Sequence, residues 1–132
     1  TQGQLAFLVN EKYLFTGDTL FQGSVGGTKG PGHDTFEALQ HSILNVLLRL
    51  PLSTRIYPGH MGPTTVESEI DNNPFVRAWM GRDKVVPEKC LYKGEAVHLL
   101  LRARDYDGGS KCWIKNFDGR QDIVPGSQVT AL

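Results

Sequence analysis

An acidic and an imidazole side chain each follow a short apolar run that ends in a turn. Residues 13–16 (YLFT) carry β-favouring side chains and lead into Gly17 and Asp18. Residues 56–63 (IYPGHMGP) repeat the arrangement, with proline and glycine on both sides of His60. Burying a carboxylate is costly unless something pairs with it, and a divalent metal ion is one such partner. Asp18 and His60 are therefore candidate ligands of a metal site.

Two side chains do not by themselves define a metal site. Zinc in proteins usually has three or four protein ligands. On spacing alone, Asp18 could be a turn residue that hydrogen-bonds its own backbone, and His60 could be an ordinary loop histidine. The other histidines, His33, His41 and His98, have no supporting motif around them. The spacing therefore leaves both interpretations of Asp18 and His60 open.

The two motifs resemble the second half of a metallo-β-lactamase-fold hydrolase. They are residues 14–21 (LFTGDTLF) and residues 57–65 (YPGHMGPTT), and the sequence Asn-Pro-Phe at 73–75 is also typical of this group. The resemblance covers residues 1–80 and is closest to the hydroxyacylglutathione hydrolase (glyoxalase II) branch. It implies that Asp18 bridges two metal ions and that His60 binds one of them.

The same resemblance implies an activity and a cofactor. The expected enzyme hydrolyses a small-molecule thioester or ester by attack of a metal-bound hydroxide, with Asp18 and His60 in the catalytic site. Two zinc ions are the first expectation, and mixed nitrogen and oxygen ligands also admit iron or manganese. An alternative in the same branch is an oxidoreductase similar to the persulfide dioxygenases, which use a single iron.

Part of the family pattern has no counterpart in this sequence. The family's His-x-His-x-Asp-His run, which supplies most of the metal ligands, is absent. Residues 1–3 (TQG) match the stretch that follows a further family histidine. We therefore expect the 132 residues to be a C-terminal portion of a larger domain and to be inactive without its N-terminal half.

Composition narrows the range of partners. Fourteen basic and fourteen acidic residues cancel, so charge gives no reason to expect binding to nucleic acid or to an anionic membrane. Cys90 and Cys112 lack metal-like spacing and are expected to be small buried thiols in a reducing cytoplasm. Strands that should pack against a missing half would leave an apolar face uncovered, so a homo-oligomer is a further expectation.

The first part of the chain is expected to alternate strands with helices. Strands at 4–9 and 13–16 should form an antiparallel hairpin. Residues 22–32 hold too many glycines for regular structure and should line the site. A helix from Asp34 to Pro51 should carry one apolar stripe, with Asp34 and Glu37 capping it. A strand at 53–57 and a second helix from Thr64 to about residue 71, capped by Thr64 and Glu67, should follow.

The second part is expected to contain only β-structure. From Val85 onward, strands are predicted at 96–103, 111–117, 120–124 and 128–130, with Asp118-Gly119 as a hairpin turn. Short strands joined by tight turns indicate a small SH3-like or Tudor-like barrel, which should pack on the preceding part. The predicted fold class is α+β: the C-terminal half of an αββα metallo-β-lactamase sandwich at 1–82, followed by a β-barrel-like appendage at 83–132.

A function of a different class is a partner-binding module. The aromatic side chains Tyr92, Tyr106, Trp113 and Phe117 could form a ligand surface on the appendage. More often, such residues form the core of a small barrel, and Trp113 is expected there. Burial of these rings would favour the core interpretation.

Overall fold

The computed structural model describes residues 7–9, 13–17, 20–21, 23–28, 35–45, 47–58, 62–105 and 108–132. The strands are β1 (Phe7–Val9), β2 (Tyr13–Gly17), β3 (Leu20–Phe21), β4 (Ser24–Val25), β5 (Arg55–Pro58), β6 (Thr64–Thr65), β7 (Glu88–Tyr92), β8 (Glu95–Arg104), β9 (Ser110–Lys115), β10 (Gln121–Pro125) and β11 (Val129–Ala131). The helices are α1 (Phe36–Asn45), α2 (Val66–Asn72) and α3 (Pro74–Trp79), with 3₁₀ turns η1 (Leu47–Arg49) and η2 (Gly126–Gln128). The fold class is α+β, as predicted.

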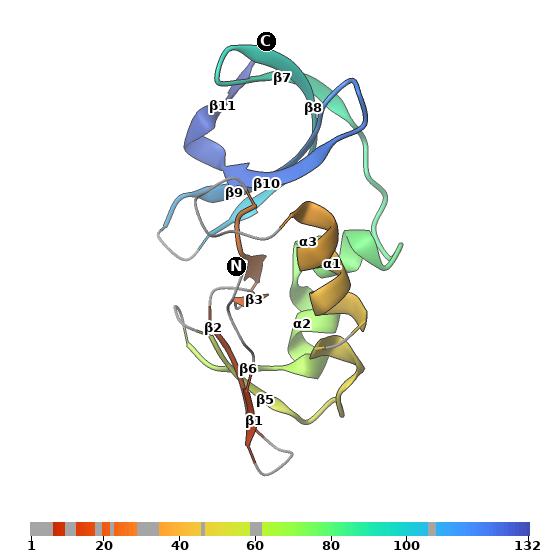
Figure 1. The fold of residues 1–132 in the computed structure, drawn as a ribbon, viewed down its shortest axis with the longest axis vertical. Helices are drawn as coiled ribbons and strands as arrows, with labels where there is room; N and C mark the ends of the chain where they lie inside the picture. Colours follow the sequence, from red (N-terminus) through yellow and green to blue (C-terminus); the bar gives the residue numbers. More distant parts are fainter. Residues whose placement is uncertain are drawn as a thin grey trace.

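A four-stranded sheet in the order β1-β2-β5-β6 forms the lower part of the molecule (Figure 1). β1 and β2 make the expected antiparallel hairpin, whereas β2 and β5 run parallel. The helices lie along one side of this sheet, and Ile43, Ile56 and Val66 are buried in one core between the two layers. No helix in the described ranges combines the length and apolar character that a membrane crossing requires.

The helix caps differ from the prediction. In α1 the side chain of Thr35 accepts a hydrogen bond from the backbone N–H of Ala38, so Thr35 caps the described helix. In α2 the cap is Thr65, whose hydroxyl accepts from the N–H of Ser68, and not Thr64. The predicted cap Asp34 lies outside the described residues, and the predicted start at Thr64 was one residue early. Neighbouring oxygen-bearing side chains compete for the cap position, and the backbone conformation decides between them.

The first helix also ends earlier than its apolar stripe indicated. α1 stops at Asn45, and the 3₁₀ turn η1 carries the chain toward Pro51. Phe36, Leu39 and Ile43 are buried as predicted, and Leu48 is the buried side chain of the turn. A 3₁₀ turn advances fewer residues per turn, so the apolar positions that follow α1 no longer keep the helical spacing.

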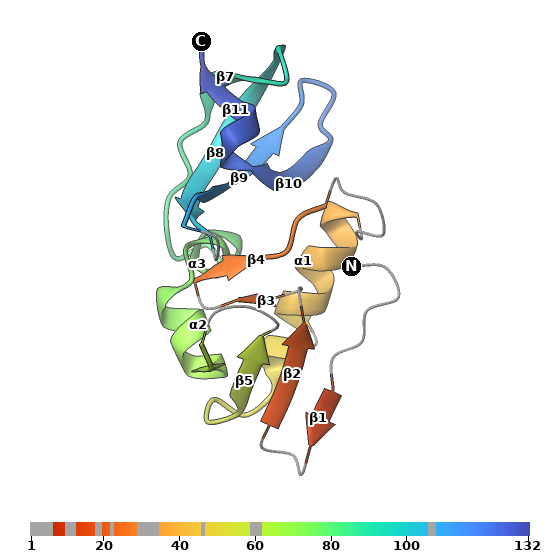
Figure 2. The same ribbon diagram turned by 90° about the vertical axis from the view of Figure 1, so that its left-hand side faces the viewer.

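The second part is a five-stranded antiparallel sheet in the order β10-β9-β8-β7-β11. It curls into a nearly closed ring, with η2 between its two edge strands, which gives the predicted barrel-like shape (Figures 1 and 2). β7 was not predicted. It joins β8 through Lys93 and Gly94, whose φ angles of 50° and 81° suit the tight two-residue turn of a twisted hairpin.

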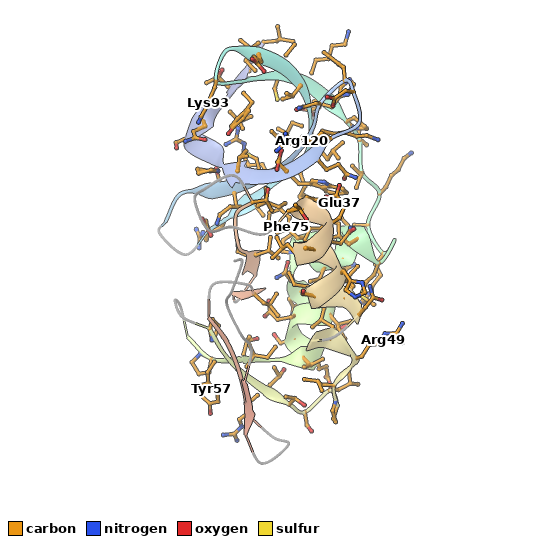
Figure 3. The ribbon with its side chains drawn as sticks, in the orientation of Figure 1. Glu37, Arg49, Tyr57, Phe75, Lys93 and Arg120 are labelled. Carbon is orange, nitrogen blue, oxygen red and sulfur yellow. The ribbon has the colours of Figure 1, made fainter. Side chains whose placement is uncertain are left out.

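The two parts share a core. Trp113 and Ile123 of the five-stranded sheet are buried with Phe36 and Phe75 of the helices, and Figure 3 shows Phe75 where the helices meet that sheet. The appendage's own interior is a separate cluster: Cys90, Tyr92, Val97, Cys112, Ile114, Val124 and Val129. Trp113 is therefore buried as predicted, but in the junction and not in the barrel's interior. The boundary between 82 and 83 stays a prediction.

Replacing Gly126 with Ala is expected to lower the free energy of unfolding by about 1–3 kcal/mol. A Cβ at this position would overlap Oγ of Ser110 and lie 2.8 Å from Nη1 of Arg102. That guanidinium donates to Ser110 and to the carbonyls of Gly126 and Val129, so the overlap would disturb the link between β8 and β11. Urea denaturation measures the change. Gly62→Ala is the matched control, because a Cβ there meets no atom of the described residues within 4 Å. An equal loss in both variants would contradict the explanation.

Candidate functional site

The strands that precede the two candidate ligands lie side by side. β2 and β5 are parallel neighbours, with Phe15 opposite Tyr57 and Gly17 opposite Pro58. Figure 2 shows both strands pointing the same way, so they end at the same edge of the sheet. Asp18 comes one residue after Gly17, and His60 comes two residues after Pro58. Loops at the carboxyl ends of parallel strands are where α/β sheets assemble ligand sites.

Both candidate ligands, Asp18 and His60, lie outside the described residues, as does the loop histidine His33. Their predicted meeting in one cleft therefore stays a prediction. Within the described ranges, no group of three or more His, Cys, Asp or Glu side chains could hold a metal ion. An Asp and a His nevertheless fit a zinc, iron or manganese ion by the chemistry of their donor atoms.

A buried carboxylate links the segments that follow these strands. Glu69 of α2 is 1% exposed. Its Oε1 accepts hydrogen bonds from the backbone N–H of Gly23 and from Nδ2 of Asn73, both at 2.9 Å. Its Oε2 accepts from the hydroxyl of Thr64 at 2.8 Å. Glu69 does not stand out in the sequence, because glutamate side chains on helices usually face solvent.

The described part of the glycine-rich segment is more ordered than the sequence indicated. Ser24 and Val25 form β4, which pairs with β3, and both side chains are buried. The glycine content did not predict this order, because the order depends on hydrogen bonds from the appendage. The hydroxyl of Ser24 donates to Asp105, and the ammonium of Lys111 donates to the carbonyl of Val25 at 3.3 Å. Lys111 also forms a buried ion pair with Asp105 at 3.1 Å.

A second polar contact joins the same segment to β10. The hydroxyl of Thr28 donates to Oδ1 of Asp122 at 2.8 Å and accepts from the backbone N–H of Ile123, also at 2.8 Å. The backbone N–H of Thr28 donates to the carbonyl of Ile123 at 3.0 Å. Thr28 thus has both side-chain and backbone hydrogen bonds to the appendage. Residues 23–28 are held from two sides, by α2 and by the five-stranded sheet.

The two described histidines lie away from the ends of β2 and β5 in the chain and have other contacts. His41 is exposed on α1, with Nδ1 at 3.2 Å from the side-chain amide of Asn45. His98 lies on β8, where its ring meets Phe117 edge to face with centroids 4.7 Å apart. Neither belongs to a metal-ligating cluster within the described ranges.

The described aromatic residues of the appendage differ in burial. Tyr92 and Trp113 are buried in two different clusters, whereas Phe117 is 61% exposed and Tyr106 lies outside the described residues. An open groove of about 750 Å³ runs beside Phe117. It is lined by Pro87, His98, Leu100, Trp113, Lys115, Asn116, Phe117, Asp118, Gly119 and Gln121. The burial of Tyr92 and Trp113 favours the core interpretation for those two rings.

The cysteines are packing residues. Cys90 and Cys112 are free and buried, as predicted, and both lie in the interior of the appendage. Burial raises the pKa of both thiols, because the thiolate loses its hydration there. A raised pKa makes them poor nucleophiles and poor metal ligands near neutral pH.

This chain is similar in sequence to known hydrolases. It is 42% identical over 79 residues to the hydroxyacylglutathione hydrolase GloC of Haemophilus influenzae, and the match covers 59% of this chain and 37% of that protein. It is 38% identical over 78 residues to the probable metallo-hydrolase YqgX of Bacillus subtilis, covering 58% and 36%. This chain is thus similar in sequence to metallo-hydrolases, among them a hydroxyacylglutathione hydrolase. The resemblance carried by the two motifs is thereby confirmed.

The similarity covers part of each relative. This chain spans a little over a third of the length of the metallo-hydrolases that it matches. Among solved structures, the B3 metallo-β-lactamase BLEG-1 is 45% identical over 50% of this chain and 31% of its own, with a TM-score of 0.47. The di-iron-bound form of TTHA1623 is 48% identical over 49% and 31%, with a TM-score of 0.45. No protein-family model matches the sequence.

Proposed function

We propose that this metallo-hydrolase relative serves as part of a metal-dependent hydrolase of thioesters or esters. The observation that carries the proposal is the parallel pairing of β2 and β5, which brings Gly17 and Pro58 into register immediately before Asp18 and His60. The identity to a hydroxyacylglutathione hydrolase supports a thioester among the possible substrates. A reducing cytoplasm is the proposed compartment, in keeping with the two free thiols.

Each candidate ligand has a distinct role in this proposal. Asp18 offers two carboxylate oxygens and would bridge two metal ions, whereas His60 would bind one of them through a neutral ring nitrogen. A bound divalent ion lowers the pKa of water and polarises the substrate carbonyl. Zinc is the first candidate, with iron or manganese admitted by the same donor atoms. The backbone turns after β2 and β5 would hold the two side chains at one edge of the sheet.

The test compares this chain with an extended chain that carries the family's His-x-His-x-Asp-His half ahead of residue 1. We expect the 132-residue chain to lack stoichiometric metal and thioesterase activity, because Asp18 and His60 are fewer than the three or four ligands of a zinc site. The extended chain should have both. Elemental analysis and a thiol-release assay measure the two properties. Stoichiometric metal and activity in the short chain would show that its own ligand set is complete.

A second candidate function is partner binding by the appendage. The observation in its favour is Phe117, which remains exposed beside the open groove. In this view the part before residue 83 is a scaffold without chemistry. The extended chain separates the two functions, since a scaffold would neither hold stoichiometric metal nor hydrolyse thioesters.

A further inference from the structure

We propose that Glu69 is a positioning residue for the metal site, because it ties together the two segments that follow the candidate ligands. The inference rests on the proposed function for the identity of those ligands. Gly23 lies five residues after Asp18, and Thr64 lies four residues after His60. The carboxylate of Glu69 binds both, one through each of its oxygens.

The geometry makes Glu69 a brace between separate parts of the chain. Gly23 lies 46 positions from Glu69 in sequence, and its N–H reaches Oε1 at 2.9 Å. Thr64 belongs to β6, which pairs with β5. Asn73 completes the brace, because its Nδ2 donates to Oε1 of Glu69 and to the carbonyl of Ser24. The segment after β2 and the segment after β5 are therefore joined through one buried carboxylate.

The chemistry of the side chain suits this role. An ionised carboxylate only accepts hydrogen bonds, and here three donors converge on it. Burial of an unpaired carboxylate would be strongly unfavourable, so the three donors are required for Glu69 to lie 1% exposed. The same three bonds restrict where the donors can move. A shorter Asp at this position would not span from Gly23 to Thr64.

The hydrogen bond from the backbone N–H of Gly23 distinguishes a bracing role of Glu69 from simple packing in the core. An apolar side chain could fill the same volume in the core, but it would leave the N–H of Gly23 without this acceptor. Metal sites depend on the groups that orient their ligands, and removing such a group typically costs about 10- to 100-fold in metal affinity. Glu69 would act on Asp18 and His60 through the backbone of the segments that carry them.

Three variants of the 132-residue chain isolate the brace. Glu69→Ala removes it. Glu69→Gln keeps it without the charge, because Oε1 still accepts from Gly23 and Asn73 while Nε2 donates to the Thr64 hydroxyl, which can turn to accept. Glu67→Ala is the matched control, since Glu67 is an exposed acid of the same helix. If Glu69→Ala fails to fold, Thr64→Val replaces it, because that change removes one donor of the three.

The first measurement is amide hydrogen exchange of Gly23 by NMR, which needs no metal. We expect exchange to accelerate at least about tenfold in Glu69→Ala and to stay near the native rate in Glu69→Gln and Glu67→Ala. Unchanged exchange in folded Glu69→Ala would overturn the brace. In the fallback variant Thr64→Val, a smaller acceleration is expected, and none at all would overturn it equally.

The second measurement is Mn²⁺ titration, followed by paramagnetic broadening of the amide signals of Asp18 and His60. This method detects a weak site. We expect the apparent affinity for Mn²⁺ to fall about tenfold in Glu69→Ala and to recover in Glu69→Gln. Faster Gly23 exchange with unchanged Mn²⁺ affinity would overturn the positioning role while leaving the metal site intact.

Asp18→Ala and His60→Ala in the same titration test the proposed function separately. Both should abolish the selective broadening. Broadening that persists in both variants would overturn the metal site, and with it the positioning role, even where Gly23 exchange still shows the brace. A failure of the proposed function is in this way distinguished from a failure of the inference about Glu69.

Discussion

Replacing Asp18 with Ala in the extended chain is expected to reduce thioester hydrolysis by at least about 100-fold and to lower bound metal below stoichiometric amounts. The reason is that, in the proposed function, Asp18 would bind both ions, so its loss would affect two coordination spheres. His60→Ala should have a similar effect on activity with a smaller loss of metal, because His60 would bind one ion. Elemental analysis and steady-state kinetics measure these effects.

The control for this prediction is His41→Ala. His41 is an exposed histidine of α1 whose described contact is with Asn45, so activity and metal content should stay native. Far-ultraviolet circular dichroism shows whether each variant keeps the fold. Native metal content in both Asp18→Ala and His60→Ala would mean that the site is built from other residues.

Replacing Trp113 with Ala is expected to lower the free energy of unfolding by about 3–5 kcal/mol. Its ring is 9% exposed and forms a cluster with the rings of Phe36 and Trp79, which also contact each other. It stacks on Phe36 with ring centroids 6.0 Å apart, and it meets Trp79 edge to face at 6.2 Å. Removing it would open a cavity at the junction of the helices and the five-stranded sheet. Urea denaturation followed by circular dichroism measures the change.

Phe117→Ala is the matched control for Trp113→Ala. Phe117 follows the same strand, β9, but is 61% exposed, so its loss should change stability by less than about 1 kcal/mol. A near-neutral effect of Trp113→Ala would contradict the packing explanation. If that result came with loss of a binding partner, it would favour the partner-binding function instead.

The sequence predicted the positions of strands and turns better than it predicted which elements pack against each other. The apolar runs around both motifs identified β2 and β5, and Asp118-Gly119 correctly marked the turn between β9 and β10. Alternation along β9 placed Trp113 on the opposite face from Cys112 and Ile114, but alternation does not say what covers each face. The contact with Phe36 depends on how the appendage packs, which is why the position of Trp113 in the junction was not predicted.

Strand β7 and the burial of Glu69 were not predicted, because neither has a clear local signal in the sequence. β7 is a mixed run of charged and apolar residues, and its turn uses Lys93 at a positive φ, a position where asparagine or aspartate is the usual signal. In α2, Glu67 and Glu69 fit the first turn of a helix equally well by charge. Only the tertiary arrangement, in which Gly23, Thr64 and Asn73 converge, decides that Glu69 is the buried one.

The buried pair of Asp105 and Lys111 has a consequence for the independence of the two parts. Both groups belong to the appendage, but Ser24 and the carbonyl of Val25 complete their hydrogen bonding. If the appendage were separated from residues 23–28, the ion pair would lose the hydrogen bonds that Ser24 and Val25 provide. Residues 23–28 would in turn lose their buried contacts with the appendage. We therefore expect that the appendage could not be moved to another protein without loss of stability. Its exchange between relatives would require matched changes at Ser24 and Thr28, so these segments are expected to be inherited together.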